Sequence, residues 1–428
     1  MSVAAGVTGA VTLAVTRAEV IRRRTLGVFF LLVAAAIAVL FGLDVPGTTR
    51  ADFVLNLASA QAISVPDLVV PVQTTAFLLA AVSAFLGAVQ VVRGFGRWSN
   101  VVLALVIGLF IFSFLAWAAR DTSLSLVGML QGTVVRATPL TLGAFSGLLC
   151  ERSGVINVAI EGQMLMGAFV AAMVTSATSS AALGMLAGML AGGLIGLILA
   201  VFAIRYLVDQ IIVGVVLDLF CLGLTGFLYD RLMVPFQATL NSAAVVRPLA
   251  IPLLSKIPIL GPILFDQNVF VYLLLILLAA IQVALFQTRW GLRVRAVGEQ
   301  PRAADTAGIN VLRTRYINVL LGGLVAGLAG SFFTIGAVGQ FTKNMTSGRG
   351  FISLAAMISG GWTPIGSFGA SLVFGFADAL QNFLSVLNVP ISSYFLLMAP
   401  YIATILVVAG VVGRVRPPAN DGKPYVKQ

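Results

Sequence analysis

The chain contains no histidine and only two cysteines, and charged residues make up only 10% of its 428 residues. Without histidine or a cysteine cluster, zinc sites, haem ligation and histidine-based acid–base catalysis are excluded. Cys150 and Cys221 lie in apolar stretches, where a thiol serves as a small packing residue. The chain also lacks a G-x-x-x-x-G-K-[ST] motif, so it cannot cradle ATP phosphates in that way. We therefore expect neither a metalloenzyme nor a P-loop ATPase, and we expect no cofactor.

The scarcity of charge contrasts with a hydrophobic content of 59%. A soluble domain carries about 25% charged residues, so lipid must replace water as the solvent along much of this chain. Because a spanning helix needs about 20 apolar residues, we predict an all-α, polytopic transmembrane helix bundle with about twelve spans. The predicted spans are 26–43, 74–92, 99–118, 128–150, 156–175, 182–203, 210–229, 269–287, 315–337, 351–361, 365–385 and 394–412.

Two of these spans have an irregular pattern. The run 128–150 contains Arg136 and Pro139, and the run 351–361 is too short to cross a bilayer alone. Each is expected to be a broken or re-entrant helix if it does not span. Such segments occur at membrane depth only where they are buried in protein or line a cavity, which gives both runs functional interest.

The basic residues indicate the orientation of the chain. Lysine and arginine total 26 against 15 acidic residues, a net charge of +11. Twelve crossings place both termini on one side, and most of the basic residues fall in the termini and short loops of that side. The positive-inside rule then places both termini in the cytoplasm. The charge excess is therefore explained by topology, without a nucleic-acid partner.

Several polar side chains lie inside the predicted spans. Ionisable groups within a bilayer are costly and often mark a transport path. We predict a polar path lined by Asn157, Glu161, Gln163, Asp218 and Asp378. Alternatively, the same groups form hydrogen bonds between helices or cap broken helix ends. A proton relay through the carboxylates would instead make the protein a secondary transporter, although Arg136 is the only basic residue in the interior of a predicted span.

Glycine-containing motifs occur at related places in the two halves. The run 153–163 and the run 347–356 both begin with Ser-Gly and continue into an apolar stretch, and the second leads into a glycine-rich turn at 360–366. We interpret this as a weak internal repeat of the kind found in transporters. Glycines at 184, 188, 192 and 196, and at 323 and 327, recur every four residues, which predicts close helix packing in lipid.

The loop 288–314 is rich in arginine and contains one further pattern. Proline favours the first turn of a helix and glycine the residue after its end, so Pro301 to Ala307 is predicted to be a short helix followed by Gly308. A compact charged helix between two spans suits docking of a soluble partner. A structured connector without a partner is the alternative.

Three motifs together resemble one family. They are the run 137–163 with its Glu-Arg-Ser-Gly-Val-Ile-Asn core, the run 296–309, and the run Gly360-Gly361-Trp362-Thr363-Pro364-Ile365-Gly366. Together they resemble the membrane permease subunits of bacterial ABC importers for nucleosides and simple sugars, and the nucleoside branch most closely. The resemblance covers roughly 125–412.

The resemblance implies an inner-membrane, multi-pass permease subunit that performs no chemistry itself. It implies three protein partners: a cytoplasmic ABC ATPase, a second permease subunit, identical or homologous, and an extracytoplasmic substrate-binding protein. Membrane lipid surrounds the chain, and the implied substrate is a nucleoside, with ribose or another simple sugar as the alternative. The residues implied to couple to the ATPase are Glu299, Pro301, Arg302, Ala303, Ala304, Asp305 and Gly308.

The sequence departs from the family pattern in two ways. Asp218 stands where relatives are expected to have an uncharged asparagine, which complicates transfer of the path lining. Residues 1–122, with three predicted spans, precede the part that resembles the family. We therefore predict three parts: an N-terminal extension at 1–122, the permease core at 123–412 and a cytoplasmic tail at 413–428.

Overall fold

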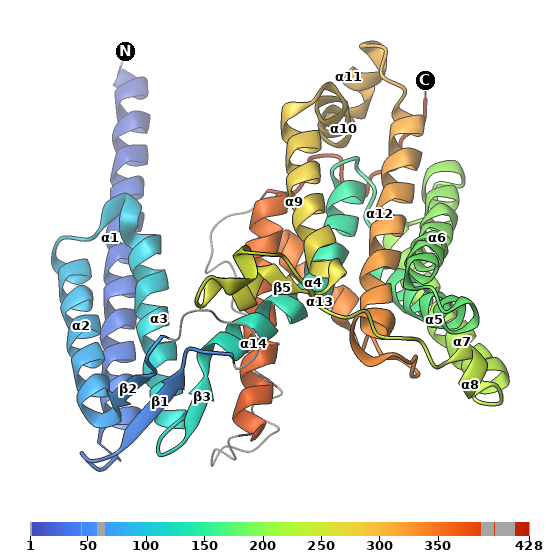
Figure 1. Cartoon of the computed structure of the whole chain (residues 1–428). Coiled ribbons are helices and arrows are strands. Elements are labelled where there is room, and N and C mark those ends of the chain that lie inside the picture. Colours follow the sequence, from blue (N-terminus) through green and yellow to red (C-terminus); the bar gives the residue numbers. More distant parts are fainter. Residues whose placement is uncertain (1, 44, 58–64, 387–397, 399–415, 428) are drawn as a thin grey trace. The chain divides into compact units, whose positions relative to one another are not determined.

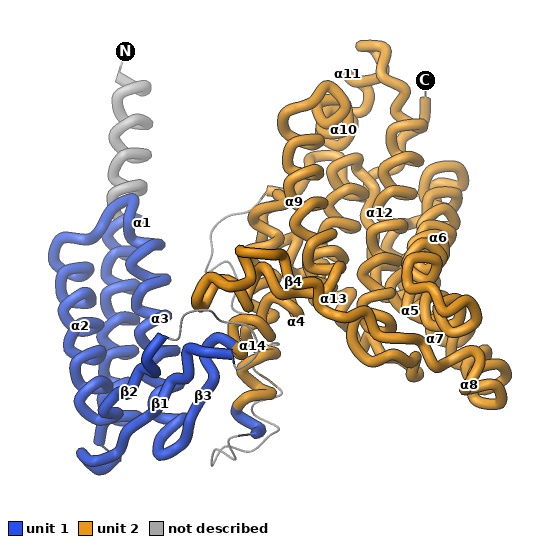
Figure 2. The backbone as a smooth tube through the Cα atoms, viewed as in Figure 1, with its two compact units in different colours: residues 1–59, 64–127, 384–390 blue, residues 60–63, 128–383, 391–428 orange. Residues whose placement is uncertain are grey.

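The computed structural model describes residues 2–43, 45–57, 65–386, 398 and 416–427 (Figure 1). The backbone divides into two compact units (Figure 2). Unit 1 contains residues 1–59, 64–127 and 384–390, and unit 2 contains most of the remainder. The predicted division into extension, core and tail remains a prediction.

Unit 1 combines three helices with a small sheet. Its helices are α1 (Ser2–Ala36), extended by a π-helical turn at Ile37–Gly42, α2 (Val72–Val92) and α3 (Ser99–Ala118), which follows a 3-10 turn at Gly96–Trp98. The sheet has the order β2-β1-β3, formed by β1 (Arg50–Val54), β2 (Leu68–Pro71) and β3 (Ser123–Ser125). Strand β1 pairs antiparallel with β2 and parallel with β3. Phe41 packs among Phe110, Phe114 and Trp117, which joins the helices.

Unit 2 is a helical bundle, and its described α-helices range from 4 to 26 residues in length. They are α4 (Leu126–Glu151), α5 (Ile160–Thr178), α6 (Ala181–Ala200), α7 (Gln210–Leu228), α8 (Gln237–Leu240), α9 (Val269–Gln287), α10 (Arg289–Glu299), α11 (Pro301–Thr306), α12 (Val311–Phe333), α13 (Arg349–Ser359) and α14 (Pro364–Val386). π-helical turns follow α6, α7 and α12 at Val201–Arg205, Tyr229–Met233 and Thr334–Val338. A 3-10 turn at Leu254–Lys256, a π-turn at Gly261–Phe265 and the two-residue strands β4 (Leu249–Ala250) and β5 (Asp266–Gln267) complete it.

Glycines allow three helices of unit 2 to approach closely. A Cβ atom on Gly192 of α6 would lie 2.5 Å from the carbonyl oxygen of Gly323 on α12, and one on Gly167 of α5 would lie 2.5 Å from that of Gly327. Only hydrogen fits at such positions, so the backbones pack directly against each other. The structure therefore confirms the packing role predicted for this glycine series.

Within the described residues, nine helical segments are long and apolar enough to cross a membrane. They are Glu19–Gly42, Val72–Val92, Gly96–Ala118, Leu126–Glu151, Ile160–Thr178, Ala181–Arg205, Gln210–Met233, Val269–Gln287 and Val311–Val338. The chain is thus an all-α, polytopic membrane protein, as predicted.

The structure gives a different outcome for each of four predicted spans. The prediction of a span at 128–150 is confirmed, because α4 is long and apolar enough to cross a membrane and is continuous through Pro139, which excludes the alternative of a broken helix. Neighbouring helices enclose this region of α4, and buried surroundings let a membrane helix tolerate proline. The segment 351–361 is the 11-residue α13, which is too short to span. The segment 365–385 forms the 23-residue α14 but is less apolar than the nine, and 394–412 lies outside the described residues.

Candidate functional site

A cavity of about 860 Å³ opens in unit 2 between α4, α13, α14 and the segment that follows α12. Its wall combines charged, amide and aromatic side chains, which include Arg136, Arg349, Asp378, Asn344, Asn382, Phe332, Phe333 and Phe374. Pockets of about 300–1,000 Å³ with a few convergent polar groups commonly bind small molecules. This cavity is therefore the candidate substrate site.

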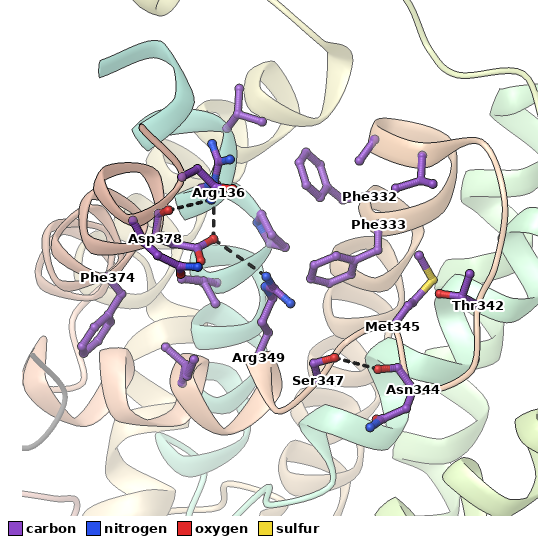
Figure 3. Close-up of a pocket in the computed structure, with 18 of the residues that line it drawn as sticks. Arg136, Phe332, Phe333, Thr342, Asn344, Met345, Ser347, Arg349, Phe374 and Asp378 are labelled. Carbon is purple, nitrogen blue, oxygen red and sulfur yellow. Dashed lines mark hydrogen bonds and ion pairs between the residues drawn. The ribbon is translucent and has the colours of Figure 1, made fainter. Parts of the chain in front are cut away.

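One carboxylate and two guanidinium groups meet in this cavity. Asp378 Oδ2 lies 3.4 Å from Nε of Arg136 and 3.8 Å from Nη2 of Arg349. Figure 3 shows the three side chains pointing toward one another from α4, α13 and α14. The side chains are about one third exposed, so they are in contact with the cavity and not sealed in the protein. Pairing lowers the cost of an aspartate in an apolar helix.

An aromatic ring extends this charged group. The guanidinium carbon of Arg349 lies 5.7 Å from the ring centroid of Phe333, within the range of a cation–π contact. Phe332 lines the same wall. The cavity therefore offers a flat apolar surface beside hydrogen-bond donors and acceptors.

Glu161 lies at the start of α5 and binds the segment that leads into α13. Its Oε1 accepts hydrogen bonds from Thr346 Oγ1 at 2.6 Å and from the amide of Gly348 at 2.8 Å. Its Oε2 accepts one from the amide of Gly350 at 2.6 Å. The first amides of a helix lack partners within that helix, so the carboxylate caps α13. It thereby positions Arg349, which lies between the two glycines.

Asn157 and Gln163 form a separate, fully buried polar cluster with Ser146 of α4. Asn157 Nδ2 donates to Ser146 Oγ and to Gln163 Oε1, both at 3.1 Å. All three side chains are excluded from solvent. The cluster joins the irregular segment between α4 and α5 to both helices, because buried polar groups require such partners.

Asp218 of α7 also faces the beginning of α5. Its Oδ1 accepts a hydrogen bond of 2.7 Å from the amide of Gly162, and its side chain is buried. Its Oδ2 has no hydrogen-bond partner among the described residues. Two carboxylates therefore lie at the first turn of α5. Asp218 of α7 accepts a hydrogen bond from an amide of this turn, and Glu161 is a residue of the turn itself.

The five residues predicted to line one path thus lie in three places. Asp378 lies in the cavity, and Asn157 and Gln163 form the buried cluster. Glu161 and Asp218 accept hydrogen bonds from amides at the starts of α13 and α5, respectively. The sequence-based prediction missed Arg349 and the pair Phe332 and Phe333. Arg349 stands in the Ser-Gly-Arg-Gly motif just ahead of a predicted span, so that motif was the available signal. The described residues contain no group of three acidic or cysteine side chains that could hold a metal.

The predicted coupling helix is present at its predicted place. Pro301 begins α11, which ends at Thr306, and Gly308 adopts a left-handed conformation with φ of +83°. The amide of Ile309 donates to the carbonyl of Ala304 at 3.0 Å, which closes the helix end. The side chains of Pro301 and Ala304 are buried. Those of Arg302 and Ala303 are exposed and available to a partner.

Sequence comparisons place the chain among membrane permeases. Residues 129–408 match the family described as branched-chain amino acid transport system / permease component. The guanosine ABC transporter permease protein NupQ of Bacillus subtilis is 41% identical over 70% of this chain and 96% of its own length. The nucleoside ABC transporter permease protein NupC of Lactococcus lactis is 38% identical over 69% of this chain and 95% of its own.

A less similar relative is named as a putative sugar permease. The putative glucose ABC transporter permease protein TsgC13 of Haloferax volcanii is 33% identical over 59% of this chain and 77% of its own length. No solved structure matches the chain. The family match over residues 129–408 includes the whole charged cavity, α11 and the capped start of α13. The chain therefore belongs to the family of branched-chain amino acid transport system permease components.

Proposed function

We propose that this chain is the membrane permease subunit of an ATP-driven importer for nucleosides, and that the substrate passes through the cavity of Arg136, Arg349 and Asp378. The observation that carries the proposal is this group of paired charges beside phenylalanine rings in one cavity. The names of NupQ and NupC support the substrate class. As a permease subunit, the chain hydrolyses no ATP itself.

The chemistry of a nucleoside suits the cavity wall. The flat base presents a π-face that can stack on an aromatic ring such as Phe333, and such stacking is largely independent of base identity. The ribose hydroxyls can bond to carboxylate and guanidinium groups such as Asp378 and Arg136. Because the Asp378 carboxylate is already paired with both guanidiniums, a neutral substrate can pass without leaving an isolated carboxylate in the cavity.

We propose that ATP hydrolysis by a partner drives transport through contacts at α11. Glu299, Pro301, Arg302, Ala303, Ala304, Asp305 and Gly308 form the element that contacts a separate cytoplasmic ABC ATPase. A second permease subunit, identical or homologous, completes the pore, and an extracytoplasmic binding protein delivers the substrate. We propose that the chain lies in the bacterial inner membrane with both termini in the cytoplasm.

Transport by the reconstituted complex tests the function. The permease, its ATPase, its partner permease and its binding protein are placed in proteoliposomes, and uptake of labelled guanosine is measured with and without ATP. We expect uptake that requires ATP and is unaffected by a proton gradient. Uptake driven by a proton gradient without ATP would instead establish a secondary transporter. Uptake of ribose or glucose in place of guanosine would favour the sugar alternative, which the name of TsgC13 supports.

Substitutions in the cavity test the path. Asp378→Asn and Arg349→Gln each break the charged group, and we expect guanosine uptake to fall at least about tenfold, equivalent to ~1.4 kcal/mol. Arg247→Gln is the matched control, because Arg247 is exposed and lies outside the cavity. Full uptake in both cavity variants would place the path elsewhere.

A further inference from the structure

The end of the chain, residues 416–427, lies against α10, α11 and α12 of unit 2, with the C-terminus near α12 in Figure 1. Two hydrogen bonds join this tail to the end of α10, directly before α11. The amide of Asn420 donates to the carbonyl of Gly298 at 2.9 Å, and the amide of Ala419 donates to Glu299 Oε2 at 3.2 Å. The tail therefore contacts the segment from which the coupling helix begins.

Tyr425 anchors the tail in the same place. Its side chain is buried and packs in an apolar cluster with Val297 of α10, Ala304 of α11 and Val311 of α12. The tyrosine hydroxyl also interacts with the carboxyl group of Asp305. One tail side chain thus fills the space between the three helices that surround the coupling element. Removing it would leave a cavity beside Ala304 of α11.

A buried cation makes α12 dependent on the tail. The Arg315 side chain is only 1% exposed, and its Nη1 donates to the carbonyl of Lys423 at 3.1 Å. Its Nε and Nη2 have no hydrogen-bond partner among the described residues. Asp421 of the tail lies near enough to this guanidinium for an electrostatic interaction. A buried guanidinium is costly without such partners, so the docked tail compensates a charge that α12 carries permanently.

The tail also reaches the far end of α13. Asp421 interacts with the side chain of Glu151, whose Oε2 accepts a 2.6 Å hydrogen bond from Trp362 Nε1. Arg152 fixes the same tryptophan, with Nη2 2.6 Å from its carbonyl oxygen. Trp362 follows the end of α13, and Arg349 begins that helix at the cavity. A helix of 11 residues is about 16 Å long, so a rigid element runs from the tail contacts to the charged group.

We propose that the carboxyl-terminal tail is a transmission element that joins α11 to α13, so that movement imposed on the coupling helix by the ATPase reaches Arg349. This inference rests on the proposed function. It assigns positioning roles to Tyr425, Arg315 and Asp421, none of which contacts the cavity. A complex with an undocked tail hydrolyses ATP without moving substrate at the normal ratio.

The experiment uses the full complex in proteoliposomes and measures guanosine transported per ATP hydrolysed. Tyr425→Ala removes the anchor, and Tyr425→Phe keeps the ring while losing the contact with Asp305. Val426→Ala is the matched control, because Val426 is the next residue and its side chain is 63% exposed. We expect Tyr425→Ala to lower the transport ratio at least about tenfold, as for the loss of ~1.4 kcal/mol of coupling free energy. The phenylalanine variant is intermediate and the control unchanged.

Hydrogen exchange provides a second readout that requires no transport. In Tyr425→Ala the amides of α11 should exchange at least about tenfold faster, because local opening no longer has to displace the ring. A synthetic peptide of residues 416–428 should restore both slow exchange and the transport ratio in a chain truncated after Val415. This rescue distinguishes positioning from a general loss of folding.

Three outcomes would overturn the proposal. They are an unchanged transport ratio in Tyr425→Ala, unchanged exchange of α11, and failure of the peptide to restore a truncated chain that still assembles with its ATPase. Failure of the proposed function looks different, because the unaltered complex would then show no ATP-dependent guanosine uptake. Slow α11 exchange that depends on Tyr425 would in that case still demonstrate the contact.

Discussion

The carboxylate of Glu161 on α5 caps α13, with its Oε2 2.6 Å from the amide nitrogen of Gly350. These residues are 189 positions apart in the sequence. A Cβ atom on Gly350 would lie 2.5 Å from the Cα of Glu161, so only glycine permits this approach. The two Ser-Gly runs of the sequence are therefore in contact, because the first run holds the start of the second, while the internal repeat itself stays a prediction.

Glu161→Gln should lower stability and leave the cavity intact. The neutral amide accepts weaker hydrogen bonds than the carboxylate, which serves three donors, and we expect unfolding to become easier by about 1–3 kcal/mol. Thermal unfolding of the purified protein in detergent measures the change. Thr346→Val, which removes a single donor, should cost less.

Transport by the same variant separates the two roles considered for Glu161. If Glu161 only caps α13, guanosine uptake per folded complex should fall only to the extent that Arg349 is displaced. Complete loss of uptake at unchanged unfolding temperature would show instead that Glu161 contacts the substrate, as the sequence-based path prediction has it.

Asp218→Asn should be tolerated. The asparagine carbonyl can replace Oδ1 as acceptor for the amide of Gly162, and the substitution removes a buried charge with a partnerless oxygen. We expect stability equal to or above that of the unaltered chain. Asp218→Ala should instead cost about 1–3 kcal/mol, because the amide of Gly162 would stay buried without a partner. Unfolding of the three proteins under one condition compares them, and a large loss in Asp218→Asn would contradict the capping role.

Local patterns were sufficient to predict much of the fold. Apolar runs of about 20 residues predict spanning helices because lipid forces the backbone to bond within each segment. Pro301 and Gly308 marked the ends of α11 because each has a backbone preference of its own. At Pro139 the local pattern left a continuous and a broken helix open, since the continuity of α4 depends on the helices packed around it.

The site was harder to predict because it depends on partners distant in sequence. Glu161 and Asp378 look alike as acidic residues in apolar runs, but one meets backbone amides and the other meets two arginines. Only the tertiary structure supplies these neighbours. Arg349 lay just outside a predicted span, and so its pairing with Asp378 did not follow from the local pattern.

Gly192→Ala should destabilise the bundle. A methyl group there would lie within about 2.5 Å of the α12 backbone, so the helices must separate, and overpacking of this kind costs about 1–3 kcal/mol. Gly223→Ala is the matched control, because that glycine is also helical but has nothing within 4 Å of an added Cβ atom. Thermal unfolding should distinguish them, with the control at or above the stability of the unaltered chain. Equal losses in both would contradict the packing explanation, because alanine has a higher helix propensity than glycine at either position.

Docking of the tail should depend on pH through Asp421. Burial raises the pKa of the Asp421 carboxyl from its usual 3.8 to about 6. Because the docked carboxyl holds its proton more tightly than the free one, docking is strongest below about pH 4 and weakens as the pH rises toward 6. Glu151 and Arg315 face the same carboxyl. Exchange of the amides of residues 419–423, corrected for the intrinsic pH dependence, should therefore become faster across this interval. Asp421→Asn should abolish the dependence, and an unaltered profile in that variant would assign the titration to Glu151.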